Sequence, residues 1–176
     1  MNCSLNDPGQ ADLNCEGPEA PGDSVATVGP QHACRKCGSK GRPVARKTVL
    51  LMLKPERLAQ ATSQGYRFCG TPECLVVYFD DEGHPRFYVD DLRLRVGVKM
   101  KSDPIPLCYC FGFYENDVRD EFARSGASTI PSRIKQLIKD GMCACDARNP
   151  AGLCCLGEVN VAVSRIATEL EARYEP

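Results

Sequence analysis

The spacing of hydrophobic residues divides the chain into a first part with strand-like patterns and a later part with helical patterns. In the first part, short aliphatic and β-branched runs predict strands, and Pro55 predicts the start of a short helix that ends near Gly65. The predicted strands are 44–53, 75–80, 86–89 and 92–100. The last of them alternates hydrophobic and polar residues along its whole length, which is the pattern of a half-buried strand.

After Pro106 the period of the hydrophobic residues becomes helical, and three helices are predicted. They begin with a cap at Asn116 or Asp117, at Thr129 beside Pro131, and near Gly157, and the first two end at Gly126 and Gly141. The fold class is therefore expected to be α+β, with a β-rich subdomain at 32–102 followed by a helical subdomain at 103–176.

Residues 1–31 differ from the rest of the chain in composition. They contain no Lys or Arg, five acidic residues and repeated Pro and Gly, and they include Cys3 and Cys15. Such a segment cannot bury enough apolar surface to offset its ordering entropy, so we expect a disordered acidic tail.

Charge and hydropathy exclude several classes of protein. The 22 basic and 23 acidic residues give a net charge of -1, which provides no overall field to attract nucleic acid or an anionic membrane. The chain has neither a signal peptide at its start nor an apolar run of about 18 residues, so we expect a cytoplasmic protein without a membrane span. Sequence motifs of hydrolases, phosphate-binding loops and nicotinamide sites are absent.

The 12 cysteines are the informative feature of the composition. Without a signal peptide the thiols are expected to stay reduced, which favours metal ligands or redox centres over structural disulfides.

A first constellation of four cysteines lies in the β-rich part. It consists of a C-x-x-C-G motif followed by a C-x4-C motif, with the cysteines Cys34, Cys37, Cys69 and Cys74. Four thiolates at such spacings, with a glycine after the second, predict a closed tetrahedral zinc site that stabilises the sheet. The alternatives are reduced cysteines packed in a core, or replacement of one thiolate by His32 or His84.

A second constellation lies in the helical part. It comprises two C-x-C motifs and one Cys-Cys pair, with the cysteines Cys108, Cys110, Cys143, Cys145, Cys154 and Cys155. Four of these six thiols could hold a [2Fe-2S] cluster where helix N-termini and backbone amides offset the negative charge. A second zinc site and a dithiol redox pair are the alternatives.

Four segments together resemble a known family. They are the stretch from Cys34 to Val44, Tyr66 to Phe79, the motif Leu107-Cys108-Tyr109-Cys110-Phe111-Gly112-Phe113, and the run Cys143 to Gly157. In this order they resemble the N-terminal zinc and [2Fe-2S] domain of CopZ-like copper metallochaperones. The helical part is also similar to the cluster-binding module of bacterioferritin-associated ferredoxin.

The resemblance implies zinc on the first constellation and a [2Fe-2S] cluster on the second. The cluster ligands would be Cys108 and Cys110 with one cysteine of each later pair, for which we expect Cys145 and Cys155, with Cys143 and Cys154 as alternates. The two spare cysteines would then bind a soft metal such as Cu(I) as cargo.

The resemblance also implies electron transfer that reduces Cu(II) to Cu(I), which would be the only enzymatic activity. The implied partners are a redox partner and a copper-export ATPase or a separate copper chaperone. The full chaperone of this family carries a Met-x-Cys-x-x-Cys copper-binding domain, whereas the single C-x-x-C of this chain is Cys34 to Cys37, which is assigned to zinc.

Two other functions fit parts of the pattern. A ferredoxin-like electron carrier or binding module without cargo would dock through a basic surface made of Arg35, Lys36, Lys40, Arg42, Arg46 and Lys47. A zinc-ribbon nucleic-acid binder would use the same residues, but it conflicts with the net charge and leaves the helical cysteines unexplained.

Overall fold

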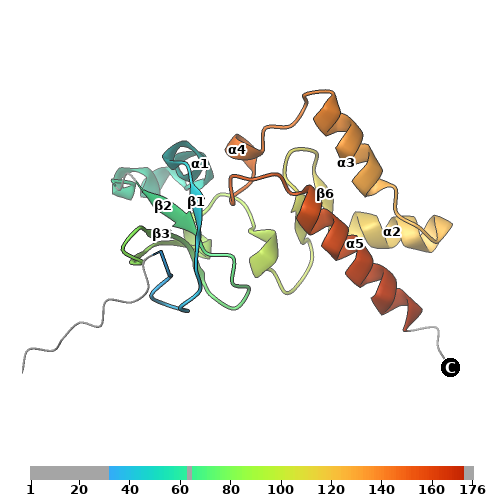
Figure 1. Cartoon of the computed structure of the whole chain (residues 1–176), viewed down its shortest axis with the longest axis horizontal. Coiled ribbons are helices and arrows are strands. Elements are labelled where there is room, and N and C mark those ends of the chain that lie inside the picture. The colour runs from blue at the N-terminus through green and yellow to red at the C-terminus, as the bar shows by residue number, and fades with distance from the viewer. Residues whose placement is uncertain (1–31, 63–64, 173–176) are drawn as a thin grey trace, which may run out of the picture.

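A computed structural model describes residues 32–62 and 65–172, and the predicted acidic tail at 1–31 lies outside them. The protein is α+β, with a small antiparallel sheet at one end of an elongated molecule and the longer helices at the other (Figure 1).

A four-stranded sheet with the strand order β1-β2-β3-β4 forms the first half. The strands are β1 (Arg42–Val44), β2 (Tyr66–Phe68), β3 (Val76–Asp80) and β4 (Pro85–Tyr88). All neighbouring strands are antiparallel, and Phe68 of β2 lies opposite Tyr78 of β3. The predicted strands at 75–80 and 86–89 are confirmed as β3 and β4, whereas β2 was not predicted.

The predicted strand at 44–53 is wrong. The chain leaves β1 at Val44 and forms the helix α1 (Arg46–Met52), followed by the 3₁₀ helix η1 (Pro55–Gln60). The side chains of Val49 and Met52 are both buried, three residues apart as on one helix face. In so short an aliphatic run, periodicity does not separate a helix from a strand.

The predicted strand at 92–100 is also wrong. This segment follows the 3₁₀ turn η2 (Val89–Asp91) and contains a second 3₁₀ turn, η3 (Gly97–Lys99), and its only β-bridge among the described residues joins Leu92 to Leu53. The alternation does not match burial, because Val98 is exposed and Lys99 is buried. No neighbouring strand in the described ranges supplies a hydrogen-bonding ladder here, so the pattern cannot form a strand.

The second half contains a two-stranded ribbon and four helices. The elements are β5 (Pro106–Cys108), β6 (Phe113–Tyr114), α2 (Glu115–Ser125), α3 (Ile130–Lys139), α4 (Cys145–Arg148) and α5 (Leu156–Glu171). The three predicted helices are confirmed as α2, α3 and α5, whereas the ribbon and α4 were not predicted.

The predicted cap of α2 at Asn116 or Asp117 is wrong by two or three residues. The cap residue is Tyr114, and the carboxylate of Asp117 reaches back to accept a hydrogen bond of 2.7 Å from its backbone N–H. Asp117 therefore stabilises the start of the helix from inside the first turn.

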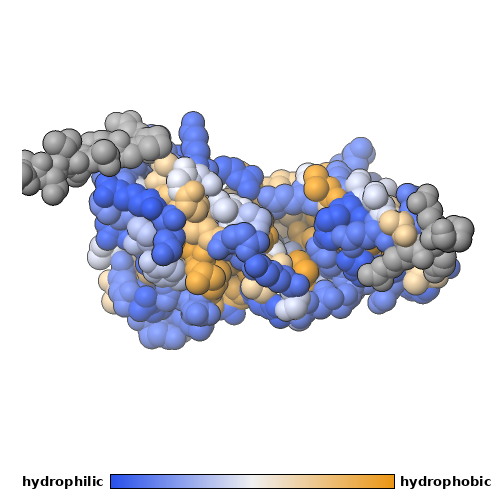
Figure 2. All heavy atoms as spheres, turned by 90° about the horizontal axis from the view of Figure 1, so that it is seen from below, coloured by the Kyte–Doolittle hydropathy of each residue, from blue (hydrophilic) through white to orange (hydrophobic). Residues whose placement is uncertain are grey.

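Each half has its own hydrophobic core. One core lies between the sheet and α1, and the other lies where α5 packs on α2, α3 and β5. A mostly apolar cavity of about 340 Å³ lies where the halves meet, with Phe68 and Val96 on one side and Val161 of α5 on the other. Hydrophobic surface also gathers around the middle of the molecule (Figure 2).

Side-chain to backbone hydrogen bonds join the two halves. The hydroxyl of Tyr78 on β3 donates to the carbonyl oxygen of Pro150 at 2.8 Å, and Thr48 of α1 donates to that of Asp146 at 2.5 Å. Within the ranges that the structure describes, no helix combines the length and hydrophobicity needed to cross a membrane.

Candidate metal centres

The C-x-x-C-G motif forms a tight turn immediately before β1. The backbone N–H groups of Cys37 and Gly38 donate to the carbonyl oxygen of Cys34 at 3.2 and 2.7 Å. Gly38 has a φ of 74°, and a Cβ there would meet nothing within 4 Å. The glycine is therefore favoured by the left-handed backbone conformation and not by a lack of space for a side chain.

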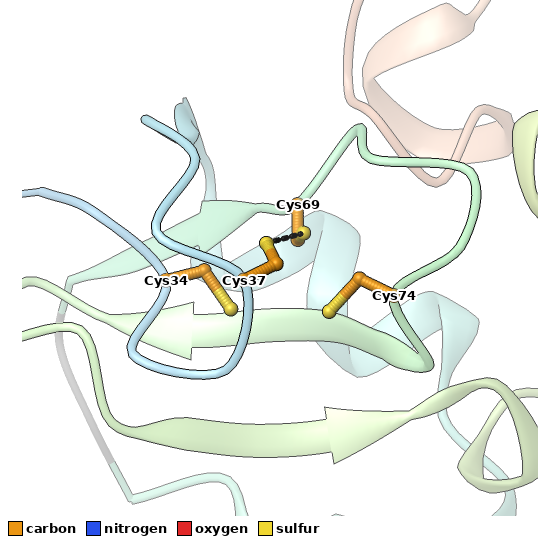
Figure 3. Close-up of side chains that lie close together, drawn as sticks. All are labelled: Cys34, Cys37, Cys69 and Cys74. Carbon is orange, nitrogen blue, oxygen red and sulfur yellow. Dashed lines mark hydrogen bonds between the residues drawn. The ribbon is translucent and has the colours of Figure 1, made fainter.

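The structure brings the four cysteines of the first constellation together. Cys69 follows β2 directly, Cys74 lies just before β3, and all four thiol sulfurs are within 4.8 Å of one another. Their side chains point toward one common centre, with 3.6 Å between the sulfurs of Cys37 and Cys69 (Figure 3). This is the donor set and spacing of a tetrahedral zinc site.

Three of these thiols, Cys34, Cys37 and Cys74, differ in how easily they ionise. Burial raises the pKa of Cys34, and it raises the pKa of Cys74 to about 12. Burial has the same tendency at Cys37, but its hydrogen bonds with Thr71 and Ser39 outweigh it and lower the pKa of that thiol to about 6. Without a cation Cys37 is therefore readily a thiolate at neutral pH, whereas Cys34 and Cys74 are not, and a bound dication would supply the charge that stabilises their thiolates.

The turn between β3 and β4 supports the zinc-site loop from outside. The backbone N–H of Arg35 donates to the carbonyl oxygen of Gly83 at 3.0 Å. A Cβ on Gly83 would lie 2.2 Å from the carbonyl oxygen of Ala33, so only glycine allows this close approach.

Neither histidine joins the four thiols. The Nδ1 atom of His32 lies 3.5 Å from Asp81, and that of His84 lies 3.4 Å from Asp80. Asp80, Glu82 and His84 also lie close together, but the buried Asp80 carboxylate already accepts hydrogen bonds from Arg86 and from the backbone N–H of His84. We interpret this group as a support of the turn between β3 and β4.

The second constellation lies between β5, α4 and the start of α5. Its thiols form two pairs: the sulfurs of Cys110 and Cys145 are 3.5 Å apart, and Cys155 hydrogen-bonds Cys108. Cys108, Cys110 and Cys155 are buried, and Cys145 is half-buried. Cys155 is also the N-cap residue of α5.

The electrostatics of the second constellation are again asymmetric. The hydrogen bond from Cys155 lowers the pKa of Cys108 to about 6. The same bond, together with burial, raises the pKa of Cys155, and burial raises that of Cys145 to about 12. Without a metal, Cys108 therefore ionises more readily than Cys145 and Cys155.

The two remaining cysteines lie at the edge of this group. Cys143 is half-buried and Cys154 is exposed, and the latter is close enough to Cys145 and Cys155 to act on them electrostatically.

Sequence reasoning missed the supporting residues of both groups. Lys99 donates to the carbonyl oxygen of Thr71 at 2.9 Å, within the loop that joins Cys69 to Cys74. Arg148 donates to the carbonyl oxygen of Cys110 at 3.0 Å. No pattern in the sequence marks these residues, because they act through the backbone of distant loops.

Part of the predicted basic surface is engaged in other contacts. Arg42 forms an ion pair of 3.1 Å with Glu158, and Arg46 donates to the carbonyl oxygen of Ala61. The predicted six-residue surface is thus not a set of free cations.

Comparisons with known proteins agree with the first centre. Residues 31–93 match the family model of the CopZ zinc binding domain. The copper chaperone CopZ of Archaeoglobus fulgidus is 31% identical over 125 residues, which cover 69% of this chain and 57% of that protein. The chain therefore spans little more than half the length of this relative.

A solved structure gives the same relationship. The crystal structure of the N-terminal domain of Archaeoglobus fulgidus CopZ matches with a TM-score of 0.60 and 27% identity. The match covers 73% of this chain and 95% of that domain, so it extends beyond the residues of the first constellation.

Proposed function

Residues 31–93 form a zinc-binding domain of the CopZ type, and from this premise we propose that the chain is a metallochaperone-like protein that handles copper or another soft metal. The observation that carries the proposal is the pair of separate thiol groups, one on the sheet and one on the helical half. Cys34, Cys37, Cys69 and Cys74 would hold the structural zinc.

The second constellation would hold a [2Fe-2S] cluster through Cys108, Cys110, Cys145 and Cys155. The arrangement of these thiols as two close pairs supports this, because each iron of such a cluster takes two thiolates. When bound, the cluster supplies one-electron transfer. Burial of three of the four thiols would limit the access of water and oxidants to the site.

Copper is the proposed cargo. One electron converts Cu(II) to Cu(I), the form that soft thiolates bind, and a redox partner would replace that electron. Cys143 and Cys154 would bind Cu(I) beside the cluster. The protein would act in the cytoplasm and pass the metal to a copper-export ATPase or to a separate copper chaperone.

The first test is anaerobic purification of the full chain, with metal and sulfide analysis and an absorption spectrum before and after dithionite. We expect about one zinc, two irons and two sulfides, with a visible spectrum that bleaches on reduction. A colourless protein with two zinc ions and no sulfide would instead indicate a zinc-stabilised binding module.

Cysteine variants distinguish the two centres. Cys145→Ser and Cys155→Ser should each lose iron while zinc is retained, whereas Cys34→Ser should lose zinc. Cys143→Ser and Cys154→Ser are the matched controls and should retain both metals. Loss of iron from these controls, with retention in Cys145→Ser and Cys155→Ser, would contradict the ligand assignment.

The same controls test the cargo. The double variant of Cys143→Ser and Cys154→Ser should lose Cu(I) uptake, measured anaerobically against a Cu(I) chelator, while its cluster spectrum is unchanged. Unaltered uptake would exclude Cys143 and Cys154 as the cargo site, whereas no Cu(I) uptake by the parent protein would leave a ferredoxin-like electron carrier as the function.

A further inference from the structure

A second cavity, separate from the apolar one, lies between α1, the 92–95 segment, the β5–β6 ribbon and α4. Its volume is about 550 Å³, and three arginines line it together with apolar side chains. We call it the arginine cavity, after Arg93, Arg95 and Arg148.

Among the residues that the structure describes, no negatively charged side chain balances the positive charge of the arginine cavity. No acidic side chain lines the cavity, and none of the three arginines forms an ion pair with a residue that the structure describes. Elsewhere arginines such as Arg57 and Arg86 are paired with carboxylates. In a protein of net charge -1, three uncompensated cations around one concave surface produce a local field that attracts anions.

Main-chain carbonyl groups hold the three guanidinium groups in place. Arg93 donates to the carbonyl oxygen of Leu51. Arg95 donates to those of Ser102 at 2.8 Å and Asp103 at 3.3 Å. Arg148 donates to that of Cys110 at 3.0 Å.

These contacts leave donors for a ligand. A guanidinium group has five N–H donors in a fixed plane, so each arginine keeps N–H groups that these contacts, and that of Arg95 with the sulfur of Met100, do not use. Such groups suit carboxylates and phosphates, which accept two parallel hydrogen bonds. Because the side chains are already held, little conformational entropy is lost when an anion binds.

Apolar side chains make up much of the rest of the cavity wall. Leu51, Leu94 and Pro104 line it, and Leu51 is 40% exposed to solvent. The volume is within the range of about 300–1,000 Å³ that is usual for small-molecule sites. We propose that the arginine cavity binds a small organic anion with two acidic groups, whose charges contact the arginines and whose apolar body packs against Leu51 and Leu94.

This site is independent of the metal chemistry proposed above. The three arginines would contact the ligand, and no thiol is needed for its binding, although Cys108 also lies in the cavity wall. Anion binding and metal content have separate readouts, so a failure of the anion site and a failure of the proposed metal sites are distinguishable.

The test is calorimetric titration of the zinc-loaded full chain at low ionic strength. The probes are glutarate, its uncharged analogue glutaramide, and inorganic phosphate. We expect glutarate to bind, glutaramide not to bind, and added salt to weaken the binding of glutarate. Phosphate, which lacks the apolar body, should bind more weakly than glutarate.

Arginine variants assign the binding to this cavity. Arg93→Gln should weaken glutarate binding by about tenfold or more, and Arg148→Gln combined with it should abolish binding. Arg46→Gln is the matched control, because Arg46 is also exposed and also donates to a carbonyl oxygen but lies outside the cavity. Equal affinity in Arg93→Gln, Arg46→Gln and the parent protein, or no binding at all, would overturn the proposal. The single Arg93→Gln variant keeps Arg148 beside the cysteines, and its zinc content and thermal unfolding verify that it is folded.

Discussion

Lys99 is a buried lysine beside the zinc-site loop, with 8% of its surface exposed. Its ammonium group reaches the carbonyl oxygen of Thr71, and it lies 6.0 Å from the centre of the Phe68 ring. Four thiolates around a divalent zinc leave two negative charges in excess. A buried cation that also fixes the loop between Cys69 and Cys74 would offset part of that charge.

We predict that Lys99→Met lowers the affinity for zinc by about tenfold, as found for residues that support metal ligands in other proteins. Competition with a zinc chelator of known affinity measures this effect. The matched control is Lys101→Met, because the side chain of Lys101 is 75% exposed and forms an ion pair with Glu73 of the same loop. An equal affinity in both variants would show that the charge of Lys99 does not act on the metal.

Glu121 stabilises the start of the neighbouring helix α3 through hydrogen bonds. Its carboxylate accepts hydrogen bonds from Ser128 at 2.9 Å and from the backbone N–H of Thr129 at 2.6 Å, where α3 begins. Burial opposes ionisation, but these hydrogen bonds outweigh it and hold the pKa of Glu121 below its usual 4.5.

Glu121→Gln should therefore reduce the free energy of unfolding by about 1–3 kcal/mol at neutral pH. The contribution of the carboxylate is complete above pH 4.5, and it is lost as the pH falls through the lower pKa of the folded state. The difference between parent and variant should accordingly shrink in acid. Urea unfolding at several pH values tests this, with the exposed Glu56→Gln as the control. A difference that does not depend on pH would contradict the role of the carboxylate.

At the scale of single residues, the sequence predicted the cysteines that come together but not the residues that support them. The spacing of Cys34, Cys37, Cys69 and Cys74 is local enough to indicate one metal site. Lys99 contacts a backbone group that is distant in the sequence, and Glu121 contacts residues that belong to no sequence motif. Only the folded structure therefore reveals their roles.

Elements were predicted best where length and period were unambiguous. The helices α2, α3 and α5 each span ten or more residues, long enough for the helical period to show. The short run that became α1 and the alternating 92–100 segment were misassigned, because their final structure depends on which partners they meet. The tertiary contacts of Val49 and Leu92 decide both cases.

The turn between β3 and β4 shows how one element supports another. Gly83 has a φ of 86° and lies against the carbonyl oxygen of Ala33. Gly141 has a similar φ of 72° but has open space around it. Substitution of Gly141 therefore measures the free-energy cost of the backbone conformation alone, whereas substitution of Gly83 adds the cost of the close contact with Ala33.

Gly141→Ala should cost about 1–3 kcal/mol of stability for the conformation alone. Gly83→Ala should cost about 1–3 kcal/mol more, because the added methyl group displaces the zinc-site loop. It should also accelerate the release of zinc to a chelator, whereas Gly141→Ala should not. Equal losses of stability and equal rates of zinc release would show that the turn does not support the site.

At the scale of the whole molecule, the sheet with the first thiol group and the loop that carries the second are physically connected. The loop between α4 and α5 includes Pro150, whose carbonyl oxygen accepts the hydrogen bond from Tyr78 in the buried interface. Tyr78 lies on β3, which begins two residues after Cys74. Zinc on the sheet should therefore stabilise the loop that positions Cys154 and Cys155.

Tyr78→Phe removes this connection and leaves the Pro150 carbonyl group buried without its partner, at a cost of about 1–3 kcal/mol. We predict that amide hydrogen exchange in the 149–155 loop becomes about tenfold faster or more. Amides of α3 serve as the internal control, because that helix packs on α5 rather than on the sheet. Removal of zinc from the parent protein should accelerate exchange in the same loop. If Tyr78→Phe accelerates exchange in this loop and zinc removal does not, the hydrogen bond acts locally and the two metal centres are independent. If both changes accelerate the exchange, the zinc-bound sheet is the support on which the second constellation is assembled.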